Sequence, residues 1–575
     1  MQELVAKKRG LKGPKLYGIV IILSLVTMFL IFFFISWGNT FGKTKSVISE
    51  ERAVDIMNSL YKDIKVTQLP PIKENVDLEI QNLADILPDI SRYNAQVRPL
   101  QGTEWIEIVS STEKATVSSG GPDYNRWLVD MAVAFNSLRR VIDGVQVSVS
   151  VRGVASGVAM DYISSGKHVP DAFTPSNTLW GDALSASGRN IELVTPRLTG
   201  NVAGIVIHKT KYEAFIAKYG PVSVESIFKA VTDGDFTMGY TNPFASSTGA
   251  NFLLSLLYAT NSDDPLGPEA AKAFEAFQNN VPFVAYTTLQ LTESAKSGVL
   301  DGFVHEYQQF VNSPDIKDDY VFTPFGVRHD SPVYILGDIS PARRAILQQF
   351  VEFCQSPESQ KAASRMGFNG LTEYQPTYLD GKVLPQAQKL FKEKKSGNRE
   401  IVALFVADNS GSMSGRPLRL LRESLINGAK YIAATNYIGL VQFSNDVQIA
   451  VPIDKFDLNQ RSLFTGAVKN MTDGGGTAMY DAIVVAEKML HDVKPAHPNA
   501  KFMIFVLTDG ETTAGSGFND VRDMIGGLQV PVHTIGYNAN LDVLKEVSKI
   551  NEAASVTADT DDVIYQIQSF FNAEM

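Results

Sequence analysis

The stretch Ile401-Val402-Ala403-Leu404-Phe405-Val406-Ala407 is followed at once by Asp408-Asn409-Ser410-Gly411-Ser412-Met413. An unbroken apolar run of this kind is typical of a central strand in a parallel sheet, which is buried on both faces. The polar residues after it therefore lie at the carboxyl end of the strand, where open α/β sheets place their ligands. The stretch predicts a doubly wound α/β domain with a binding site at this edge.

Two more loops are expected at the same edge. The sequence Asp473-Gly474-Gly475-Gly476-Thr477 precedes a predicted helix at 478–490, and a predicted strand at 502–507 ends in Thr508-Asp509-Gly510. Together the three loops bring two carboxylates and three hydroxyls, which are hard oxygen ligands that select Mg²⁺, Mn²⁺ or Ca²⁺ over zinc or copper. The predicted ligands of this divalent cation are Asp408, Ser410, Ser412, Thr477 and Asp509.

These motifs resemble those of a known domain family. Residues 399–573 resemble a von Willebrand factor type A domain, a Rossmann-like fold, and we place the domain at 399–575. The D-x-S-x-S, threonine and T-D-G elements resemble its metal-ion-dependent adhesion site (MIDAS). The resemblance implies that the three hydroxyls bind the cation directly, while Asp408 and Asp509 act mainly through water. It also implies Mg²⁺, with Mn²⁺ or Ca²⁺ as alternatives, and a protein partner that offers an Asp or Glu carboxylate.

The middle of the chain alternates predicted strands and helices, which indicates a largely parallel α/β body. Predicted strands include 105–110, 145–151 and 204–208, and predicted helices include 127–138, 157–164 and 342–354. Three turns are rich in hydroxyl, amide and glycine residues, and unpaired N–H groups at a helix start can bind an anion or a polar ligand. Ordinary helix capping is the alternative for each turn. The candidate cleft residues are Ser156, Gly157, Ser176, Asn177, Asn242, Ser246, Ser247 and Thr248.

The runs 152–163, 169–176, 239–243 and 350–368 resemble periplasmic-type (type II) solute-binding proteins of ABC importers. The resemblance covers 96–390 and implies two α/β lobes joined by two crossing strands, near 195–204 and 320–327. Lobe two would span about 204–322, and the lobes would close on a small polar or anionic solute. The receptor of an importer needs no further domain, but this chain has one. Whether the solute-binding-like domain acts here as a sensor or as a scaffold therefore stays open.

The N-terminal region predicts a membrane anchor. Residues 16–37 contain no charge, and a helix of that length reaches about 33 Å, enough to cross a hydrocarbon core of about 30 Å. The positive-inside bias places the preceding end in the cytoplasm, because it holds Lys7, Lys8, Arg9, Lys12 and Lys15 against Glu3. We expect a cytoplasmic stub at 1–15, a transmembrane helix at 16–37 and a stalk or N-terminal elaboration at 38–95. The protein would then be a single-pass cell-membrane protein with its bulk outside the cell.

The composition indicates which partners are not expected and which cellular environment the protein fits. The 575 residues carry a formal net charge of −10, and basic residues do not run together beyond the N-terminus, so nucleic acid is not an expected partner. The single cysteine, Cys354, excludes an intrachain disulfide, a thiolate zinc cluster and a lipid-attachment cysteine near the N-terminus. An external protein without disulfides fits a bacterial envelope.

The sequence offers no catalytic motif, and we expect a binding protein rather than an enzyme. His305-Glu306 does not continue into H-E-x-x-H, and Gly411 to Gly415 has Met413 where a nucleophile elbow has serine. Metal-dependent hydrolysis would need a general base, for which Glu511 is the one candidate beside the cation. Our first hypothesis is a membrane-anchored binding or adhesion protein that uses the cation site. The alternative is a transport-linked or sensory solute receptor whose C-terminal domain docks it to a membrane complex.

Overall fold

The computed structural model describes residues 48–575 apart from 80–81, 118–123, 283, 286–287, 297, 299, 398, 511, 538–540, 549, 551–554, 559–564 and 566–575. The predicted stub at 1–15, the predicted membrane helix at 16–37 and Glu511 lie outside these residues. Within the described part of the chain, no helix combines the length and the apolar character that crossing a membrane requires.

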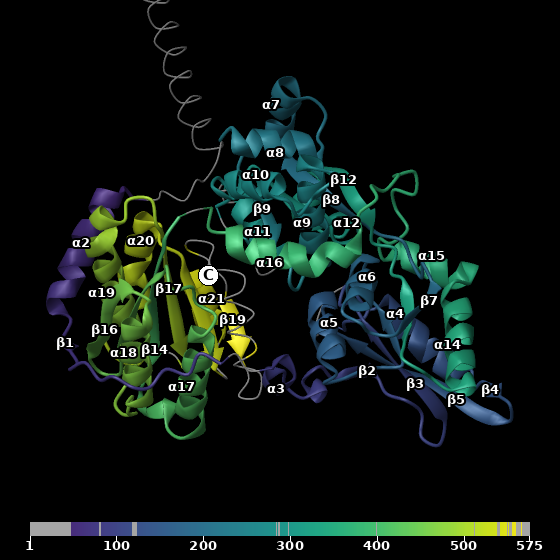
Figure 1. The fold of residues 1–575 in the computed structure, drawn as a ribbon, viewed down its shortest axis with the longest axis horizontal. Coiled ribbons are helices and arrows are strands. Elements are labelled where there is room, and N and C mark those ends of the chain that lie inside the picture. Colours follow the sequence, from purple (N-terminus) through teal and green to yellow (C-terminus); the bar gives the residue numbers. More distant parts are fainter. Residues whose placement is uncertain are drawn as a thin grey trace, which may run out of the picture. The chain divides into compact units, whose positions relative to one another are not determined.

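The C-terminal domain is built on a seven-stranded sheet (Figure 1). Its strands are β1 (Val66–Gln68), β14 (Ile401–Asp408), β15 (Tyr437–Phe443), β16 (Val447–Lys455), β17 (Lys501–Thr508), β18 (Val532–Tyr537) and β19 (Ser555–Ala558). Their order is β1-β16-β15-β14-β17-β18-β19, in which β14 is parallel to β15 and β17, and β16 is antiparallel to β15. All eight residues of β14 are buried, as expected for a central strand covered on both faces.

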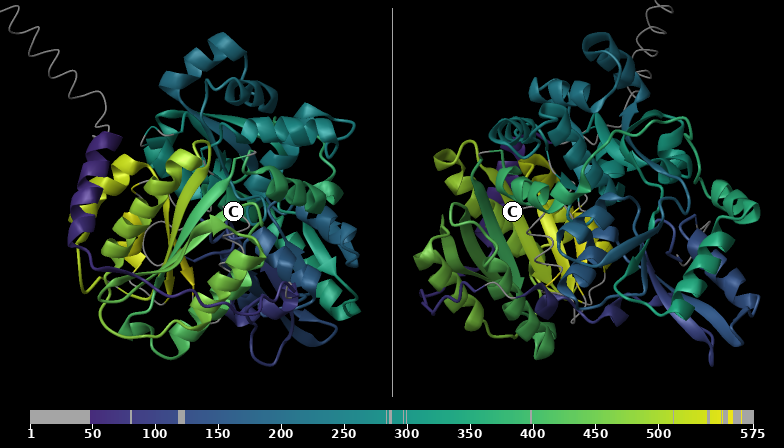
Figure 2. Two further views of the ribbon diagram at one scale, coloured as in Figure 1. Left: turned by 60° about the vertical axis from the view of Figure 1, so that its left-hand side comes forward. Right: turned by 45° about the vertical axis from the view of Figure 1, so that its right-hand side comes forward.

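Helices cover this sheet on both faces (Figure 2). They are α17 (Arg416–Ala429), α18 (Leu458–Lys469), α19 (Met479–Val493), α20 (Phe518–Leu528) and α21 (Leu541–Ser548), with short 3-10 turns at Gly411–Met413 and Lys494–Ala496. Alternate residues of β14, including Phe405, pack with Leu421 of α17 and Phe464 of α18 in one apolar core. The predicted strand, its flanking helices and the doubly wound α/β fold are therefore confirmed.

A segment from the N-terminal side completes this domain. Helix α2 (Glu50–Asp63) is capped by Ser49, whose Oγ accepts the Arg52 N–H at 3.3 Å, and packs against α19 and α20 (Figure 1). Its inner face includes Ala53 and Met57, both fully buried. Strand β1 then pairs in parallel with β16, so that Val66 lies opposite Val447. Residues 50–68 thus belong to the C-terminal domain, although they lie in the range expected as a stalk.

The chain continues from β1 across α18 and α17. The Leu69 N–H donates to the Ile449 carbonyl at 2.9 Å, and the Glu74 N–H donates to the Ser462 carbonyl at 3.2 Å. Gly466 of α18 is required here, because a Cβ on it would lie 2.1 Å from the Ile72 carbonyl oxygen. Lys430 Nζ then donates to Asp77 at 2.8 Å, near the carboxyl end of α17. The middle domain follows, so it is inserted between residue 79 and β14.

Lobe one of the middle domain contains the sheet β2-β5-β3-β6-β13-β7, with β4 paired to β5. The strands are β2 (Ala95–Val97), β3 (Glu104–Ser110), β4 (Val141–Ile142), β5 (Val145–Gly153), β6 (Ala172–Thr174), β7 (Ile191–Thr195) and β13 (Val333–Leu336). The helices are α3 (Leu83–Ile86), α4 (Trp127–Ser137), α5 (Ser156–Ser165), α6 (Leu179–Ala186), α14 (Pro341–Cys354) and α15 (Pro357–Arg365), with a 3-10 turn at Ile90–Arg92. Cys354, the last residue of α14, is buried in the core of this lobe, and this burial raises the pKa of its thiol.

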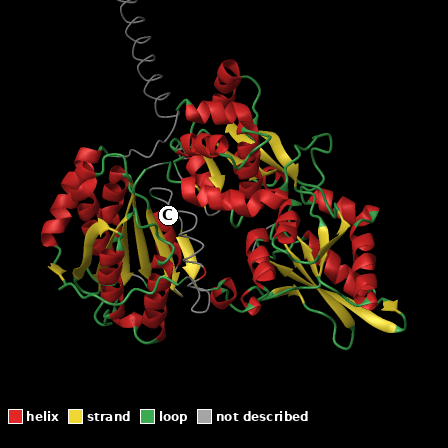
Figure 3. Cartoon of the chain, in the orientation of Figure 1, coloured by secondary structure: helices red, strands yellow, loops and turns green. Residues whose placement is uncertain are grey.

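Lobe two is a five-stranded sheet in the order β10-β9-β11-β8-β12, flanked by helices (Figure 3). Its strands are β8 (Val202–His208), β9 (Met238–Thr241), β10 (Val284–Ala285), β11 (Gly302–Glu306) and β12 (Tyr320–Arg328). Its helices are α7 (Lys209–Tyr219), α8 (Val224–Thr232), α9 (Ser247–Thr260), α10 (Pro268–Gln278), α11 (Thr288–Lys296), α12 (Tyr307–Val311) and α13 (Pro314–Lys317). A 3-10 turn at Gly381–Val383 and α16 (Leu384–Lys394) follow after α15, and α16 packs against α6 of lobe one and α9 and α10 of lobe two. The chain crosses between the lobes at 196–201 and 329–332.

Candidate functional site

The first of the three predicted loops begins at Asp408, the last residue of β14. Its side chain is fully buried, its Oδ2 accepts the Thr508 hydroxyl at 2.5 Å, and its Oδ1 accepts the Ser410 N–H at 2.8 Å. Burial raises the pKa of this carboxyl, and the neighbouring Asp509 carboxylate acts in the same direction. A cation at this position would offset both effects and hold Asp408 ionised.

Four of the predicted ligands form one continuous polar chain. Ser410 Oγ lies 3.0 Å from Ser412 Oγ, and the Ser412 hydroxyl donates to Asp509 Oδ1 at 2.8 Å. Asp408 and Ser410 are buried, Asp509 is half-buried and Ser412 is exposed. The group therefore opens to solvent on the side of Ser412 and Asp509, which leaves room for a partner's side chain to reach it.

Backbone hydrogen bonds join the threonine loop, residues 473–477, to the first loop, residues 408–413. The Gly411 N–H donates to the Gly475 carbonyl at 3.0 Å, and the Gly474 N–H donates to the Asn409 carbonyl at 2.9 Å. Gly475 has a φ of +79°, and a Cβ there would lie 2.8 Å from Asn445 Nδ2, so the turn needs glycine. The buried Thr477 follows, and its N–H donates to Thr513 Oγ1 at 2.9 Å. All three predicted loops thus converge at one edge of the sheet.

The donor set fits a divalent cation that prefers oxygen. Across the described residues, no group of three or more His, Cys, Asp or Glu side chains gathers in a way that could hold a metal ion. The site instead combines two carboxylates with three hydroxyls, which matches Mg²⁺, Mn²⁺ or Ca²⁺ rather than zinc. Sequence reasoning did not assign the bonds made by Thr508 and Thr513; the T-D-G run pointed to the first, and no local pattern pointed to the second.

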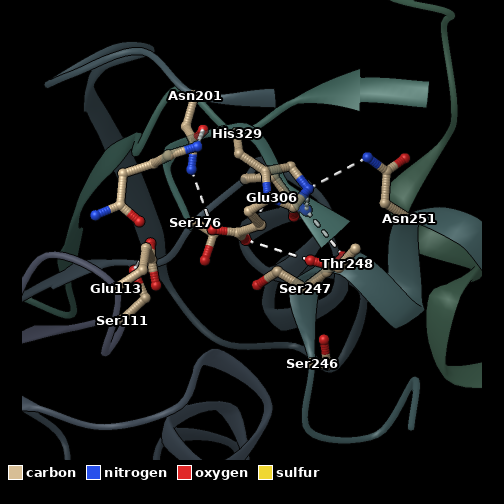
Figure 4. Close-up of polar contacts among 12 residues, drawn as sticks. Ser111, Glu113, Ser176, Asn201, Ser246, Ser247, Thr248, Asn251, Glu306 and His329 are labelled. Carbon is tan, nitrogen blue, oxygen red and sulfur yellow. Dashed lines mark hydrogen bonds and ion pairs between the residues drawn. The ribbon is translucent and has the colours of Figure 1, made fainter. Parts of the chain in front are cut away.

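Four of the eight candidate cleft residues, Ser176 of lobe one and Ser246, Ser247 and Thr248 of lobe two, are shown together at the junction of the lobes in Figure 4. Two of the eight candidates, Ser246 and Asn242, make the cap and turn bonds that ordinary helix capping predicts. Ser246 Oγ caps α9 by accepting the Gly249 N–H at 3.3 Å, and Asn242 Oδ1 accepts the Phe244 N–H at 2.9 Å. Ser176 and Ser156 bond each other within lobe one, where Ser156 Oγ accepts the Ser176 N–H at 3.3 Å. Thr248 Oγ1 donates to Glu306 within lobe two at 3.3 Å.

The remaining candidates bond directly across the two lobes. Asn177 Nδ2 donates to the Ser247 carbonyl at 3.4 Å, and Trp180 Nε1 donates to Ser247 Oγ at 2.9 Å. The Gly157 N–H, in the first turn of α5, donates to the Ala245 carbonyl at 3.3 Å. A Cβ on Gly157 would lie 1.9 Å from the Phe244 carbonyl oxygen, so the lobes touch at this point. A backbone carbonyl therefore occupies the helix start at which an anion was expected.

Sequence reasoning missed the acidic and imidazole side chains at this junction. Glu306 ends β11, and its Oε1 lies 2.8 Å from His329 Nδ1 while its Oε2 accepts Asn201 Nδ2 at 3.0 Å (Figure 4). Asn201 and His329 stand in the two crossings between the lobes. No local pattern could find this group, because Glu306 lies 105 residues from Asn201 and 23 residues from His329 in the chain, and the three meet only in the folded domain.

The amides around His329 determine its tautomer. Asn251 is fixed on both sides by Val327, because its Oδ1 accepts the Val327 N–H at 3.0 Å and its Nδ2 donates to the Val327 carbonyl at 2.9 Å. That Nδ2 also faces His329 Nε2 at 3.2 Å, and Asn177 Nδ2 faces it at 3.1 Å. Nε2 must therefore accept, so the network assigns a neutral ring that donates its Nδ1 proton to Glu306.

Fold and site together define a modular binding protein, in which an α/β domain with a cluster of hydroxyl and carboxylate oxygens at its sheet edge holds an inserted two-lobed domain. Residues 119–369 match the family model described as bacterial extracellular solute-binding protein, and residues 403–574 match that of the von Willebrand factor type A domain. The chain therefore carries a bacterial extracellular solute-binding domain followed by a von Willebrand factor type A domain.

Individual relatives are similar over single domains. Inter-alpha-trypsin inhibitor heavy chain H3 of Mus musculus is 28% identical over 183 residues, which is 29% of this chain and 20% of that protein. The chain thus spans a fifth of the length of this curated relative. Among solved structures, iron-bound HitA from Pseudomonas aeruginosa is 15% identical with a TM-score of 0.36, covering 51% of this chain and 99% of that one. A von Willebrand factor type A structure from Catenulispora acidiphila is 16% identical with a TM-score of 0.28, covering 30% and 42%.

Proposed function

We propose that this chain is a bacterial cell-surface binding protein that captures a protein partner through a divalent cation in its C-terminal domain. The observation that carries the proposal is the polar chain from buried Asp408 through Ser410 and Ser412 to Asp509, with Thr477 fastened beside it. The three hydroxyls would hold Mg²⁺ directly, and the two carboxylates would act mainly through water. When bound, the cation supplies an electrophilic position that accepts an Asp or Glu carboxylate of the partner.

We also propose how the protein acts and where in the cell it lies. The protein acts by binding and not by catalysing a reaction. The segment 16–37 anchors it in the cell membrane with residues 1–15 in the cytoplasm, and the two folded domains stand outside the cell. The half-buried Asp509 and the exposed Ser412 support this role, because a partner needs an open side of the cation to complete its coordination.

Cation binding is tested with the full-length protein and Mn²⁺ as a spectroscopic probe. We expect one bound Mn²⁺ per chain, competed by Mg²⁺, and an affinity about 10- to 100-fold lower in Asp509→Ala. Asp473→Ala is the matched control, because Asp473 is an exposed acidic residue of the threonine loop outside the ligand set. A partner captured from envelope extract should be lost on chelation and in Asp509→Ala, and kept in Asp473→Ala. Equal Mn²⁺ binding by all three proteins would refute the assignment.

The alternative function is a solute receptor that the C-terminal domain docks to a membrane complex. The two-lobed fold favours it, because Gly157 and Asn177 of lobe one bond to the loop before α9 and to the start of α9 in lobe two. Its distinguishing measurement is solute binding by the full-length protein, and the charges at the junction determine which solutes can enter.

A further inference from the structure

Three hydrogen-bond donors of lobe one are all taken by one short segment of lobe two. The Gly157 N–H donates to the Ala245 carbonyl at 3.3 Å, and Asn177 Nδ2 donates to the Ser247 carbonyl at 3.4 Å. Trp180 Nε1 donates to Ser247 Oγ at 2.9 Å. A helix start, an amide and an indole N–H are the kinds of group with which a pocket orients a polar ligand. The segment from Ala245 to Ser247 therefore supplies lobe one with the acceptors that a solute would bring.

The two lobes also touch each other directly at these groups. A Cβ on Gly157 would lie 1.9 Å from the Phe244 carbonyl oxygen, so the contact is backbone against backbone. Seven of the eight candidate cleft residues are buried, and the eighth is half-buried. A second contact lies at α12, where the buried Gln308 Nε2 donates to the Tyr124 carbonyl of lobe one at 3.0 Å. A solute could reach the three donors only if the lobes moved apart.

An apolar core runs without a break from one lobe into the other. One cluster of buried side chains includes Ile163 of α5 and Leu184 of α6 in lobe one, and Leu253 of α9 in lobe two. Trp180, whose indole makes the bond across the lobes, belongs to the same cluster and has no exposed surface. Separating the lobes would bring this apolar surface into water, which is unfavourable. The core therefore opposes opening in addition to the hydrogen bonds.

Helix α16 bridges the two lobes as well. Its Phe391 ring packs against that of Phe274 in α10 of lobe two, with 6.2 Å between the ring centroids. The helix also packs against α6 of lobe one. In the turn before it, a Cβ on Gly381 would lie 2.7 Å from Leu179 Cα, so this turn sits directly on α6. Opening of the lobes would break the contacts of α16 and its turn with one lobe or the other.

We propose that the middle domain is locked closed by its own segment from Ala245 to Ser247 and acts as a rigid scaffold. The segment occupies the donors of lobe one, and the shared core and α16 hold the lobes around it. The lobes then stay together without any solute, whereas a solute receptor closes only on its ligand. This inference goes beyond the proposed function, argues against the solute-receptor alternative and does not depend on the metal site.

Spin labels on the two lobes of the full-length protein test the proposal. Ser137→Cys in α4 and Glu225→Cys in α8 place one label on each lobe at an exposed position. Labels attach only there, because Cys354 is buried and the raised pKa of its thiol keeps it unreactive. The protein is unfolded in guanidinium, which releases any solute that was purified with it, and is refolded in solute-free buffer. We expect double electron–electron resonance to give the same single distance before and after refolding.

A longer distance after refolding would overturn the proposal, because a solute and not the segment would then have held the lobes together. A second variant needs no refolding. In Gly157→Ala the new methyl group would lie 1.9 Å from the Phe244 oxygen and needs about 3.5 Å, so the distance between the labels should lengthen by about 1.5 Å or more.

The matched control is Gly526→Ala, which makes the same change in α20. A Cβ on Gly526 would meet Ile550 at an ordinary contact distance of 3.4 Å, so the distance between the labels should stay that of the wild type. An unchanged distance in Gly157→Ala would also overturn the proposal, because the lobes could then not be in direct contact there. Mn²⁺ binding should remain intact in both variants, which separates this result from a failure of the metal site.

Discussion

At the scale of single residues, Thr508 supports the proposed cation site without belonging to the predicted ligand set. Its hydroxyl donates to Asp408 Oδ2 at 2.5 Å and so orients the buried carboxylate toward the serine loop. Partners of this kind fix the position of a ligand and tune its charge. The contribution of Thr508 is therefore one of positioning, and it can be measured apart from coordination.

We predict that Thr508→Val lowers Mn²⁺ affinity by about 10-fold while the domain stays folded. Valine keeps the shape of threonine but cannot donate to Asp408, so the carboxylate loses its fixed orientation. The measurement is Mn²⁺ titration of the full-length protein followed by paramagnetic resonance. Thr67→Val makes the same change at an exposed position of β1 and should leave the affinity unaltered. Equal losses in both variants would contradict the positioning role.

At the scale of elements, the contribution of residues 50–68 to the C-terminal domain rests on one helix face and one short strand. Met57 is fully buried between α2 and its neighbours, while Ser59 two residues on is exposed. The helix also carries an ion pair near its start, where Lys494 contacts Glu50. The buried face of α2 is the larger stabilising term, because exposed pairs contribute little.

We predict that Met57→Asp lowers the melting temperature of the C-terminal domain by about 10 °C, because it buries an unpaired charge and leaves a void. Ser59→Asp adds the same charge to the same helix on its exposed face and should change it by less than about 2 °C. Scanning calorimetry of the full-length protein measures both. Similar melting temperatures for the two variants would show that α2 does not stabilise this domain.

The sequence predicted those helices and strands whose own apolar pattern shows that they are buried. The strand at 401–408 and the helix at 479–493 carry continuous or periodic apolar patterns, so their type and place follow from local composition. The MIDAS-like loops were also readable, because each ligand lies at the end of such an element. Strand β1 was not, since Val-Thr-Gln has no strand pattern of its own and its partner lies far along the chain.

For a similar reason, sequence patterns predicted only some of the residues at the junction of the lobes. Ser and Asn at helix starts give a local signal, and three of the candidates, Gly157, Asn177 and Ser247, bond across the junction. Glu306 and His329 look like ordinary strand-end residues in the sequence. They meet because His329 and Asn201 lie in the two crossings between the lobes and bond to Glu306 there, which no local pattern contains.

At the scale of the whole molecule, buried histidines make stability depend on pH. Burial lowers the pKa of His305 to about 4 and that of His533 to about 3. In the unfolded chain both titrate near 6.5. Below that pH the unfolded state binds protons at these two imidazoles that the folded state does not, so their contribution to stability is lost as pH falls from about 6.5 toward 4. Each such group contributes a slope of up to about 1.4 kcal/mol per pH unit.

We predict that His305→Asn flattens this dependence, because asparagine takes up no proton in either state. The difference in unfolding free energy between wild type and variant should shrink as pH falls from 6.5 to 4.5, measured by urea denaturation at each pH. His533→Asn should flatten the same dependence, because burial also lowers the pKa of that imidazole. A constant difference between wild type and His305→Asn across this range would contradict the prediction.

The pairing of β1 with β16 also sets the order in which the molecule can assemble. Lys65 contacts Asp446 across 381 residues of sequence, and all of the inserted domain lies between them. At roughly 5–20 residues per second, the ribosome needs about 20–75 s to make that stretch. Helix α2 and strand β1 must therefore wait, without their partners, until the inserted domain has been synthesised. Their domain is the first to begin and the last to close.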